Sequence, residues 1–114
     1  SGATFNGTVT APNFVSPSDA RLKSRIAPIT GALGKVRALS GVTFCLKGGG
    51  PERQMGLIGQ EVQAVAPEAV VKADGVLRLA YGNLAGLLVE AIKDLATEVD
   101  RLKAARGAGG GNGL

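Results

Sequence analysis

Residues 18–23 form the one cluster in the sequence whose residue types and spacing suit acyl-transfer chemistry. Ser18 supplies a hydroxyl, and Lys23 supplies an amine five residues later. The chain has no His, which excludes Ser-His-Asp and Cys-His pairs and the common His-containing zinc sites. Its single Cys excludes an internal disulfide or a thiolate cluster. Lys and the carboxylates therefore remain as candidate bases for a Ser nucleophile, and among them the pair of Ser18 and Lys23 stands out; no metal or cofactor is expected.

The five-residue offset limits how Ser18 and Lys23 can meet. On a continuous helix they would lie about 140° apart around the axis, so Ser18 must occupy a non-helical cap or meet Lys23 of a neighbouring chain. A lysine acts as a base only when neutral, which requires lowering its pKa from about 10.4 to roughly 7 or 8. Repulsion from Arg21 and Arg25, together with burial against apolar neighbours (Leu22 and Ile26), would favour the neutral form. Asp19 would oppose it unless that carboxylate is directed elsewhere, for example to an Arg.

Spacing alone favours a simpler interpretation of the same residues. A Ser-Asp pair followed by Arg and Lys is also typical of an ordinary helix N-terminus, with Ser18 as the N-cap and Asp19 in the first turn. If the site is catalytic, the N–H groups of that first turn, with Arg21, are the expected oxyanion donors. Both interpretations require a helix to begin near Ser18.

The first forty residues predict a strand and two helical pieces. Thr4 to Ala11 alternates apolar and polar residues before Pro12, which indicates a short strand that ends a longer structure. Apolar residues then recur at helical spacing (Leu22, Ile26, Ile29, Leu33 and Val36). Pro28 forbids one straight helix, so two pieces are expected to meet near Ala27-Pro28.

The middle of the chain predicts small hairpins around a short helix, giving an α+β fold. One hairpin pairs residues 41–46 with residues 54–58 across a Gly-rich turn, and a helix spans residues 59–65. A second hairpin pairs Val70-Val71 with residues 76–79 across Asp74-Gly75, a favoured two-residue turn.

Residues 82–105 predict the longest helix, with a coiled-coil stripe that we call the seam (Leu88, Ile92, Leu95, Val99 and Leu102). The spacing of 4, 3, 4 and 3 puts the β-branched residues at a and the leucines at d. Glu98 then falls at g and Lys103 at e, where they are complementary between parallel chains. The alternative is an amphipathic helix packed on its own domain, which short apolar stripes usually are. This pattern favours two strands over three, so it does not supply the stoichiometry.

Composition points to a small domain that depends on partner chains. Gly makes up 18 of 114 residues, and three Phe with one Tyr provide little bulk for a core. Residues 1–53 hold seven basic and two acidic residues, net +5, whereas the remainder is net −1. Nucleic-acid binding is nevertheless disfavoured, because the basic residues alternate with aliphatics as on a solvated helix face. With no transmembrane span or signal-like N-terminus, the chain is expected to be soluble.

Several motifs in order give the sequence a family resemblance: Ser18-Asp-Ala-Arg-Leu-Lys23, Leu39-Ser-Gly-Val-Thr-Phe44, Met55-Gly-Leu-Ile-Gly-Gln-Glu-Val62, Pro67-Glu-Ala-Val70 and Ala91-Ile-Lys-Asp-Leu95. Together they resemble the intramolecular chaperone auto-processing domain of phage endosialidases, tailspikes and tail fibres. The resemblance covers about residues 16 to 104. It departs at Gly59, where many relatives carry Ala, and at the Gly-rich end, which lacks the long extension of some relatives.

The resemblance implies a homotrimer that helps an upstream β-helical stalk to fold and then cuts itself off. Ser18 would be the nucleophile, Lys23 the base, Arg21 and Arg25 supporting residues, and Ser18-Asp19 the bond cut. The long helix would form a trimeric coiled coil through the seam. The partners would be two further copies and the chain's own stalk, with no membrane, in the virion or in the host cytoplasm during assembly.

The implied domain organisation has three parts. Residues 1–15 would end the stalk, residues 16–105 would be the chaperone domain, and residues 106–114 would be a disordered Gly-rich tail. Three other uses stay open at this point: a non-cleaving trimerisation tip, a polyanion-binding module, and release of a transcription factor from a membrane anchor.

Overall fold

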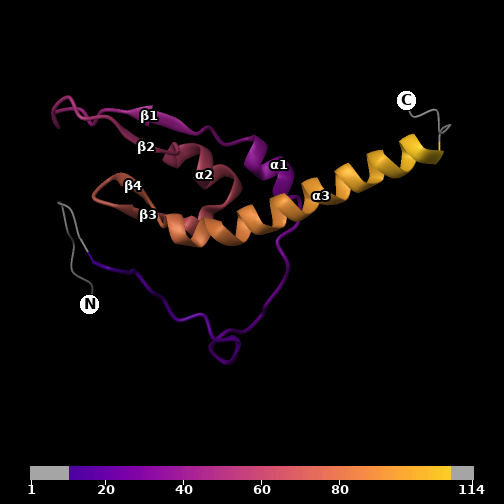
Figure 1. Cartoon of the computed structure of the whole chain (residues 1–114). Coiled ribbons are helices and arrows are strands. Elements are labelled where there is room, and N and C mark those ends of the chain that lie inside the picture. Colours follow the sequence, from indigo (N-terminus) through magenta and orange to yellow (C-terminus); the bar gives the residue numbers. More distant parts are fainter. Residues whose placement is uncertain (1–10, 109–114) are drawn as a thin grey trace.

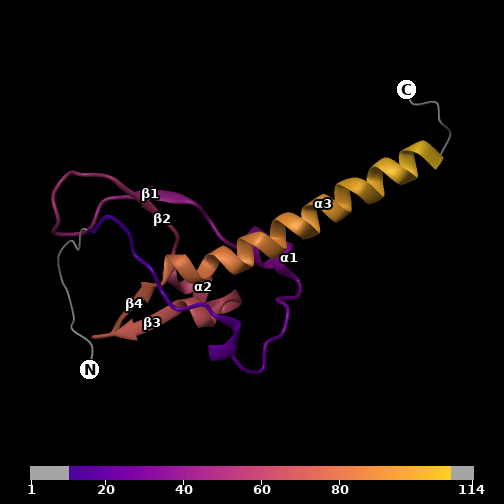
Figure 2. The same cartoon turned by 60° about the horizontal axis from the view of Figure 1, so that its bottom comes forward.

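The computed structural model describes residues 11–108, and these residues form three parts (Figures 1 and 2). Residues 11–31 are an extended segment, here called the arm. Residues 32–83 form a small α+β body, from which helix α3 (Leu84–Ala108) extends as a long rod. The radius of gyration is 19.2 Å, against about 13 Å for a compact chain of this size. Most of the predicted strand from Thr4 to Ala11 lies outside the described residues.

The arm contains only one turn of 3-10 helix, η1 (Ala20–Leu22). The sequence predicts two helical pieces that meet at Ala27-Pro28. The first piece is limited to this single turn, so that part of the prediction is wrong. Arg25 adopts a left-handed backbone with φ 55°, and Pro28 cannot donate the hydrogen bond that would continue a helix. Helix α1 (Ala32–Arg37) begins only after Gly31, which is left-handed at φ 65°.

Two antiparallel hairpins confirm the α+β fold with small sheets. Their strands are β1 (Val42–Phe44) with β2 (Gln54–Gly56), and β3 (Val70–Ala73) with β4 (Val76–Leu79). Thr43 lies opposite Met55 in the first, and Val71 lies opposite Arg78 in the second. Asp74 and Gly75 turn the second hairpin at φ 53° and 75°, as a two-residue turn with two left-handed residues requires.

Short helical elements connect the hairpins to the long helix. They are α2 (Gly59–Val65), η2 (Pro67–Ala69) and η3 (Tyr81–Asn83), which leads directly into α3. The bounds predicted for α2 are confirmed at both ends. Helix α3 begins two residues later than predicted and continues to Ala108, into the predicted tail; the rest of that tail lies outside the described residues.

The core is small and holds no polar side chain among the described residues. Its six members are each at most 5% exposed: Ala32, Val62, Ala69, Leu84, Leu87 and Ala91. Three of them line the face of α3 that packs on α1, and Asp94 Oδ2 accepts a hydrogen bond from the Leu33 N–H (3.4 Å) at the start of α1. The first three turns of α3, from Leu84 to Asp94, are thus anchored on α1.

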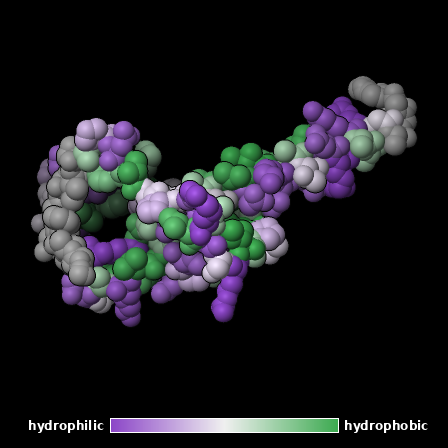
Figure 3. All heavy atoms as spheres, turned by 90° about the horizontal axis from the view of Figure 1, so that it is seen from below, coloured by the Kyte–Doolittle hydropathy of each residue, from purple (hydrophilic) through white to green (hydrophobic). Residues whose placement is uncertain are grey.

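The seam faces away from this core. Its five residues are between 40% and 66% exposed, and hydrophobic side chains reach the surface where α3 leaves the body (Figure 3). The stripe therefore does not pack on its own domain, as the alternative interpretation required. Within residues 11–108, no helix combines the length and hydrophobicity needed to cross a membrane.

Candidate functional site

The arm brings Ser18 and Lys23 together within one chain. Lys23 Nζ donates a hydrogen bond to Ser18 Oγ at 2.7 Å, and the η1 turn between them reverses the backbone. The predicted N-cap is one residue off: Asp19, not Ser18, caps the turn, because Asp19 Oδ1 accepts from the Arg21 N–H (2.9 Å). The Ser18 hydroxyl is consequently available to Lys23 rather than engaged as a cap.

The carboxylate of Asp19 is directed to Arg21, as predicted. Arg21 Nη2 lies 2.7 Å from Asp19 Oδ2, and Arg21 Nε donates to both carboxylate oxygens at 3.1 and 3.2 Å. The Arg21 guanidinium, followed by the Arg21 N–H, holds the pKa of Asp19 below its usual range, and Asp19 in turn raises the pKa of Arg21. Asp19 therefore does not pair with the Lys23 amine.

The oxyanion donors expected from the first turn are engaged within the chain. The Arg21 N–H donates to the Asp19 side chain, the Leu22 N–H to the Asp19 carbonyl and the Lys23 N–H to the Ala20 carbonyl. The Arg21 side chain is held by Asp19. A single chain thus brings the Ser18 hydroxyl and the Lys23 amine together, while the N–H groups predicted to form an oxyanion site are already engaged.

The surroundings of the dyad are open to water. Every residue of the arm is exposed, including Leu22 (73%) and Ile26 (70%), which were expected to bury Lys23. Burial of Lys23 by its own chain is therefore absent.

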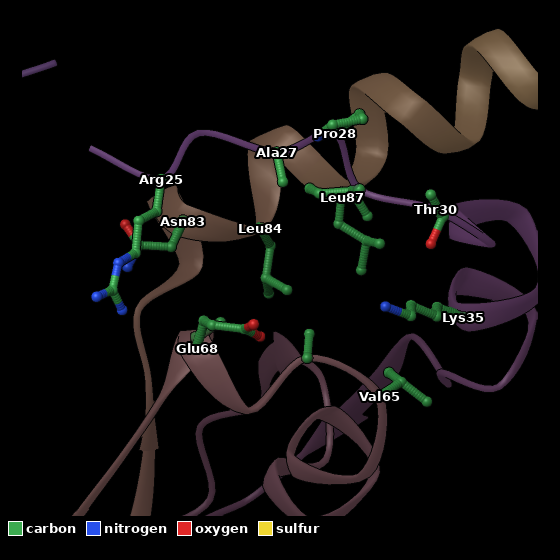
Figure 4. A pocket seen from close by; sticks show the side chains of 13 residues that line it. Arg25, Ala27, Pro28, Thr30, Lys35, Val65, Glu68, Asn83, Leu84 and Leu87 are labelled. Atoms are coloured by element: carbon green, nitrogen blue, oxygen red, sulfur yellow. The ribbon is translucent and has the colours of Figure 1, made fainter. Parts of the chain in front are cut away.

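Arg25, predicted to support the dyad, lines a cavity of about 490 Å³ between the arm and the body. Figure 4 shows Arg25 and Pro28 of the arm above Leu84 and Leu87 of α3, with Glu68 on the opposite wall. Sequence reasoning missed this cavity because its walls come from the arm and from five elements that are separate in the chain: α1, α2, η2, η3 and α3.

A second depression, here called the apolar groove, opens between β2 and the start of α3. It has a volume of about 380 Å³, and its lining includes Val36, Leu39, Met55, Leu57, Tyr81 and Leu88. The Tyr81 hydroxyl, its main polar group, accepts a hydrogen bond from the Leu57 N–H (3.0 Å). A Cβ at Gly56 would collide with that hydroxyl, so this wall requires glycine.

Metal binding finds no support in the part of the chain that the structure describes. Residues 11–108 contain no group of three or more His, Cys, Asp or Glu side chains placed to hold a metal ion.

Farther along α3, Glu98 pairs with Arg101 of its own chain, and this hydrogen bond lowers the pKa of Glu98. The predicted partner of Glu98 in a neighbouring chain was Lys103.

Comparison with known proteins defines the class of this domain. A family model described as chaperone of endosialidase matches residues 18–71, a segment that begins at Ser18 itself. The chain belongs to this family, and the family itself carries the name of a peptidase group.

Particular relatives are phage tail-fibre proteins. The chain is 38% identical over 104 residues to the long tail fiber protein Gp37 of Enterobacteria phage K3, and equally to that of Enterobacteria phage T2. Each alignment covers 83% of this chain and 8% of the relative, so the chain spans a small fraction of the length of the proteins it matches.

Proposed function

We propose that this chain is a C-terminal intramolecular chaperone of a phage tail fibre, which assembles as a homotrimer and then releases itself by cutting beside Ser18. The family and the tail-fibre relatives support the chaperone role. The 2.7 Å contact between Lys23 Nζ and Ser18 Oγ carries the proposal of self-cleavage.

Assembly of three copies is supported by what one chain leaves exposed. The seam residues lie on the surface of α3, and within residues 11–108 the core contains only six buried residues, three of them Ala. Burying a leucine or isoleucine side chain contributes about 1.5 to 3 kcal/mol, so pairing the seams of several chains would supply stability that the body lacks. The same assembly would cover the arm, where Leu22 and Ile26 have no partner in their own chain.

The cut proceeds through a serine ester. Lys23, as the neutral amine, accepts the proton of Ser18 Oγ while Oγ attacks the carbonyl carbon of the scissile peptide. The C–N bond breaks, the leaving amine takes the proton from Lys23, and water then hydrolyses the ester to restore the hydroxyl. In the assembly, contacts from neighbouring copies would exclude water from Lys23 and favour its neutral form.

The two peptide bonds beside Ser18 differ in the size of the ring that the Ser18 hydroxyl would close if it attacked within its own chain. If Ser18 attacks its own carbonyl to cut Ser18-Asp19, it must close a four-membered ring, whereas attack on the Pro17 carbonyl closes a five-membered ring. A cut at Ser18-Asp19 therefore favours the hydroxyl of a neighbouring copy. The first residue of the released fragment, Asp19 or Ser18, reports which bond is broken.

Self-removal would make the folded fibre persist kinetically. Once its chaperone is gone, an unfolded stalk has no route back, so persistence depends on the unfolding barrier rather than on equilibrium stability. The reaction is needed once per chain, and a half-life near ten minutes corresponds to a barrier of about 21 to 22 kcal/mol. A modest dyad is sufficient for that rate.

The test is cleavage of the chain expressed with its upstream stalk, followed on a denaturing gel with intact-mass analysis of the fragments. Wild type is expected to split beside Ser18, and Ser18→Ala is expected to stay whole. Ser24→Ala is the matched control, since it removes an exposed hydroxyl from the same arm. An uncut wild-type trimer would reject the peptidase half of the proposal.

The geometry at η1 also favours a second candidate, a tip that joins three chains without cutting them. Its support is that the N–H groups of Arg21, Leu22 and Lys23 all donate within the chain, which leaves no oxyanion site at the dyad. Both candidates predict the same trimer mass, so the gel distinguishes them.

A further inference from the structure

We propose that the apolar groove is a docking site for Val89 of a neighbouring copy of this chain. The proposal deepens the proposed trimer and rests on it, because it identifies a second surface, outside the seam, through which the copies would contact each other.

The groove is open and apolar, and its occupant must be apolar too. Two of the residues that line it are well exposed, Met55 at 82% and Leu88 at 47%. Its main polar group, the Tyr81 hydroxyl, is already bonded to the Leu57 N–H. A charged or strongly polar occupant would find little to hydrogen-bond inside it.

Coiled-coil register identifies the occupant. With Leu88 and Leu95 at d, Leu84 takes a g position and Val89 takes the following e position. In a parallel assembly, each g residue meets the next e residue of its neighbour. Leu84 itself is only 4% exposed, but the groove that it lines lies on this g side of α3, so register places Val89 of the adjacent copy beside the groove.

Along α3, the residues at the g and e positions change from apolar to charged where the helix leaves the body. At the g positions, Leu84 and Ala91 pack into the chain's own core and are 4% and 5% exposed, whereas Glu98 is charged where α3 extends into solvent. Charged pairs suit a coiled coil whose flanks meet water. Val89 is 53% exposed within its own chain, and a valine at an exposed e position is explained if a neighbour covers it.

Continuity with the seam favours a copy of this chain over a foreign partner. Leu88 belongs both to the seam and to the lining of the groove, so any chain that pairs with the seam passes the mouth of the groove. The contact joins two different surfaces, the groove of one copy and the e face of the next. Such a heterologous contact closes into a ring when the rotation allows it, as a threefold coiled coil does.

A photocrosslinker at position 89 tests the contact directly. Benzoylphenylalanine replaces Val89 in the Ser18→Ala chain, nitrogen-15 and unlabelled chains are refolded together, and crosslinked peptides are mapped by mass spectrometry. The expected product joins position 89 of one chain to the peptide that contains Met55 and Leu57 of another, seen as mixed-isotope mass pairs. Because the bulky probe can disturb α3, the reciprocal probe at the exposed Met55 is expected to label the peptide that contains Val89.

Two matched charge variants provide a second measurement. Val89→Lys is expected to raise the concentration needed for trimer formation at least tenfold in light scattering, because the introduced charge would enter the groove. Val71→Lys, at a valine of β3 with similar exposure (56%) outside both groove and seam, is expected to leave it unchanged.

The outcomes separate this inference from the proposed function. Labelling of the same chain, of a neighbour's arm (Leu22 or Ile26) or of a neighbour outside the groove, in a sample with the mass of three chains, overturns the docking site and leaves the trimer intact. Equal effects of the two lysine variants would also overturn it. A sample with the mass of one chain at high concentration rejects both the trimer and the docking site.

Discussion

The arm and the body differ in how much of their surface is packed: the arm brings two polar side chains into contact in the open, whereas the body forms a small core. The arm places Lys23 Nζ 2.7 Å from Ser18 Oγ, yet every one of its residues is exposed. The body and the start of α3 together bury six apolar residues of the described chain to 5% exposure or less, and no polar side chain is buried with them. A short turn is sufficient to set the distance between two reactive atoms, whereas the dry surroundings that activate a lysine require a surface that the arm does not have.

This contrast explains why assembly would precede cutting. An exposed amine in water favours the charged form, which cannot accept the serine proton. Contact with other chains would exclude water from the Lys23 amine while its hydrogen bond with Ser18 stays in place. The dyad would therefore be assembled in each chain and become active only in the complex, so that no chain is cut before it has its partners.

The largest effect is expected for Lys23→Arg, which tests whether the arm supplies the base. Arginine keeps the positive charge and the hydrogen-bonding capacity but is not deprotonated in proteins. Cleavage is expected to slow by at least about 100-fold, within the usual contribution of a general base, while light scattering shows an unchanged mass. Lys47→Arg, the same change in the exposed turn between β1 and β2, is the control. Cutting at the wild-type rate by Lys23→Arg would show that the contact in the arm has no chemical role.

The free energy of unfolding should depend on the core between the body and the start of α3, and not on the arm. Leu87→Ala removes a side chain that is 4% exposed, and the free energy of unfolding is expected to fall by about 2 to 5 kcal/mol. Leu22→Ala, at a leucine that is 73% exposed, is expected to change it by less than about 0.5 kcal/mol in chains dilute enough to be single. Urea denaturation of the two variants gives the comparison. Similar losses for both would mean that the arm packs on its own body.

A smaller effect is expected at the wall of the apolar groove. In Gly56→Ala, the new methyl group displaces the Tyr81 hydroxyl and breaks its hydrogen bond with the Leu57 N–H, at a cost of about 0.5 to 1.5 kcal/mol in unfolding free energy. Gly41→Ala is the matched control, because a Cβ there meets nothing within 4 Å. The Leu57 amide resonance, followed by NMR, should shift in the first variant alone. Equal stability of both variants would show that Tyr81 moves aside without loss.

The smallest effect is a pH dependence of the turn η1 in the arm, which the core is not expected to share. Because Arg21 lowers the pKa of Asp19, this pair stabilises η1 fully above the unfolded value, about 3.9, and the contribution is lost as the pH falls through the lower folded pKa. The Arg21 amide resonance should therefore move with the Asp19 carboxyl below about pH 4, while that of Val62 in the core stays in place. Asp19→Asn should remove the transition. Simultaneous movement of both amides would show that arm and body unfold together.

Much of the body could be predicted from the sequence because its signals are local. The Asp74-Gly75 turn specifies the second hairpin through its backbone preferences, and the helix of residues 59–65 ends before Pro67, where a helix cannot readily continue. The same holds for the contact between Ser18 and Lys23, since five residues around a single turn bring the two side chains together.

The arm could not be predicted in the same way. The helical spacing of Leu22 and Ile26 is real, but a short amphipathic helix is stable only when its apolar face is covered, and the body offers no such cover. The left-handed Arg25 and the ring of Pro28 then favour an extended path. Asp19 replaced Ser18 as the cap because its carboxylate binds both the N–H and the guanidinium of Arg21.

The sequence by itself determined the family, the two hairpins, the long helix and the contact between Ser18 and Lys23, because each depends on neighbours a few positions away or on motifs in order. Only the tertiary structure decided which stripe of α3 is buried, that the seam stays exposed, and that an apolar groove opens beside Leu88. These features arise where segments far apart in the chain pack together. No local pattern specifies which of two apolar faces a helix will turn toward its own domain.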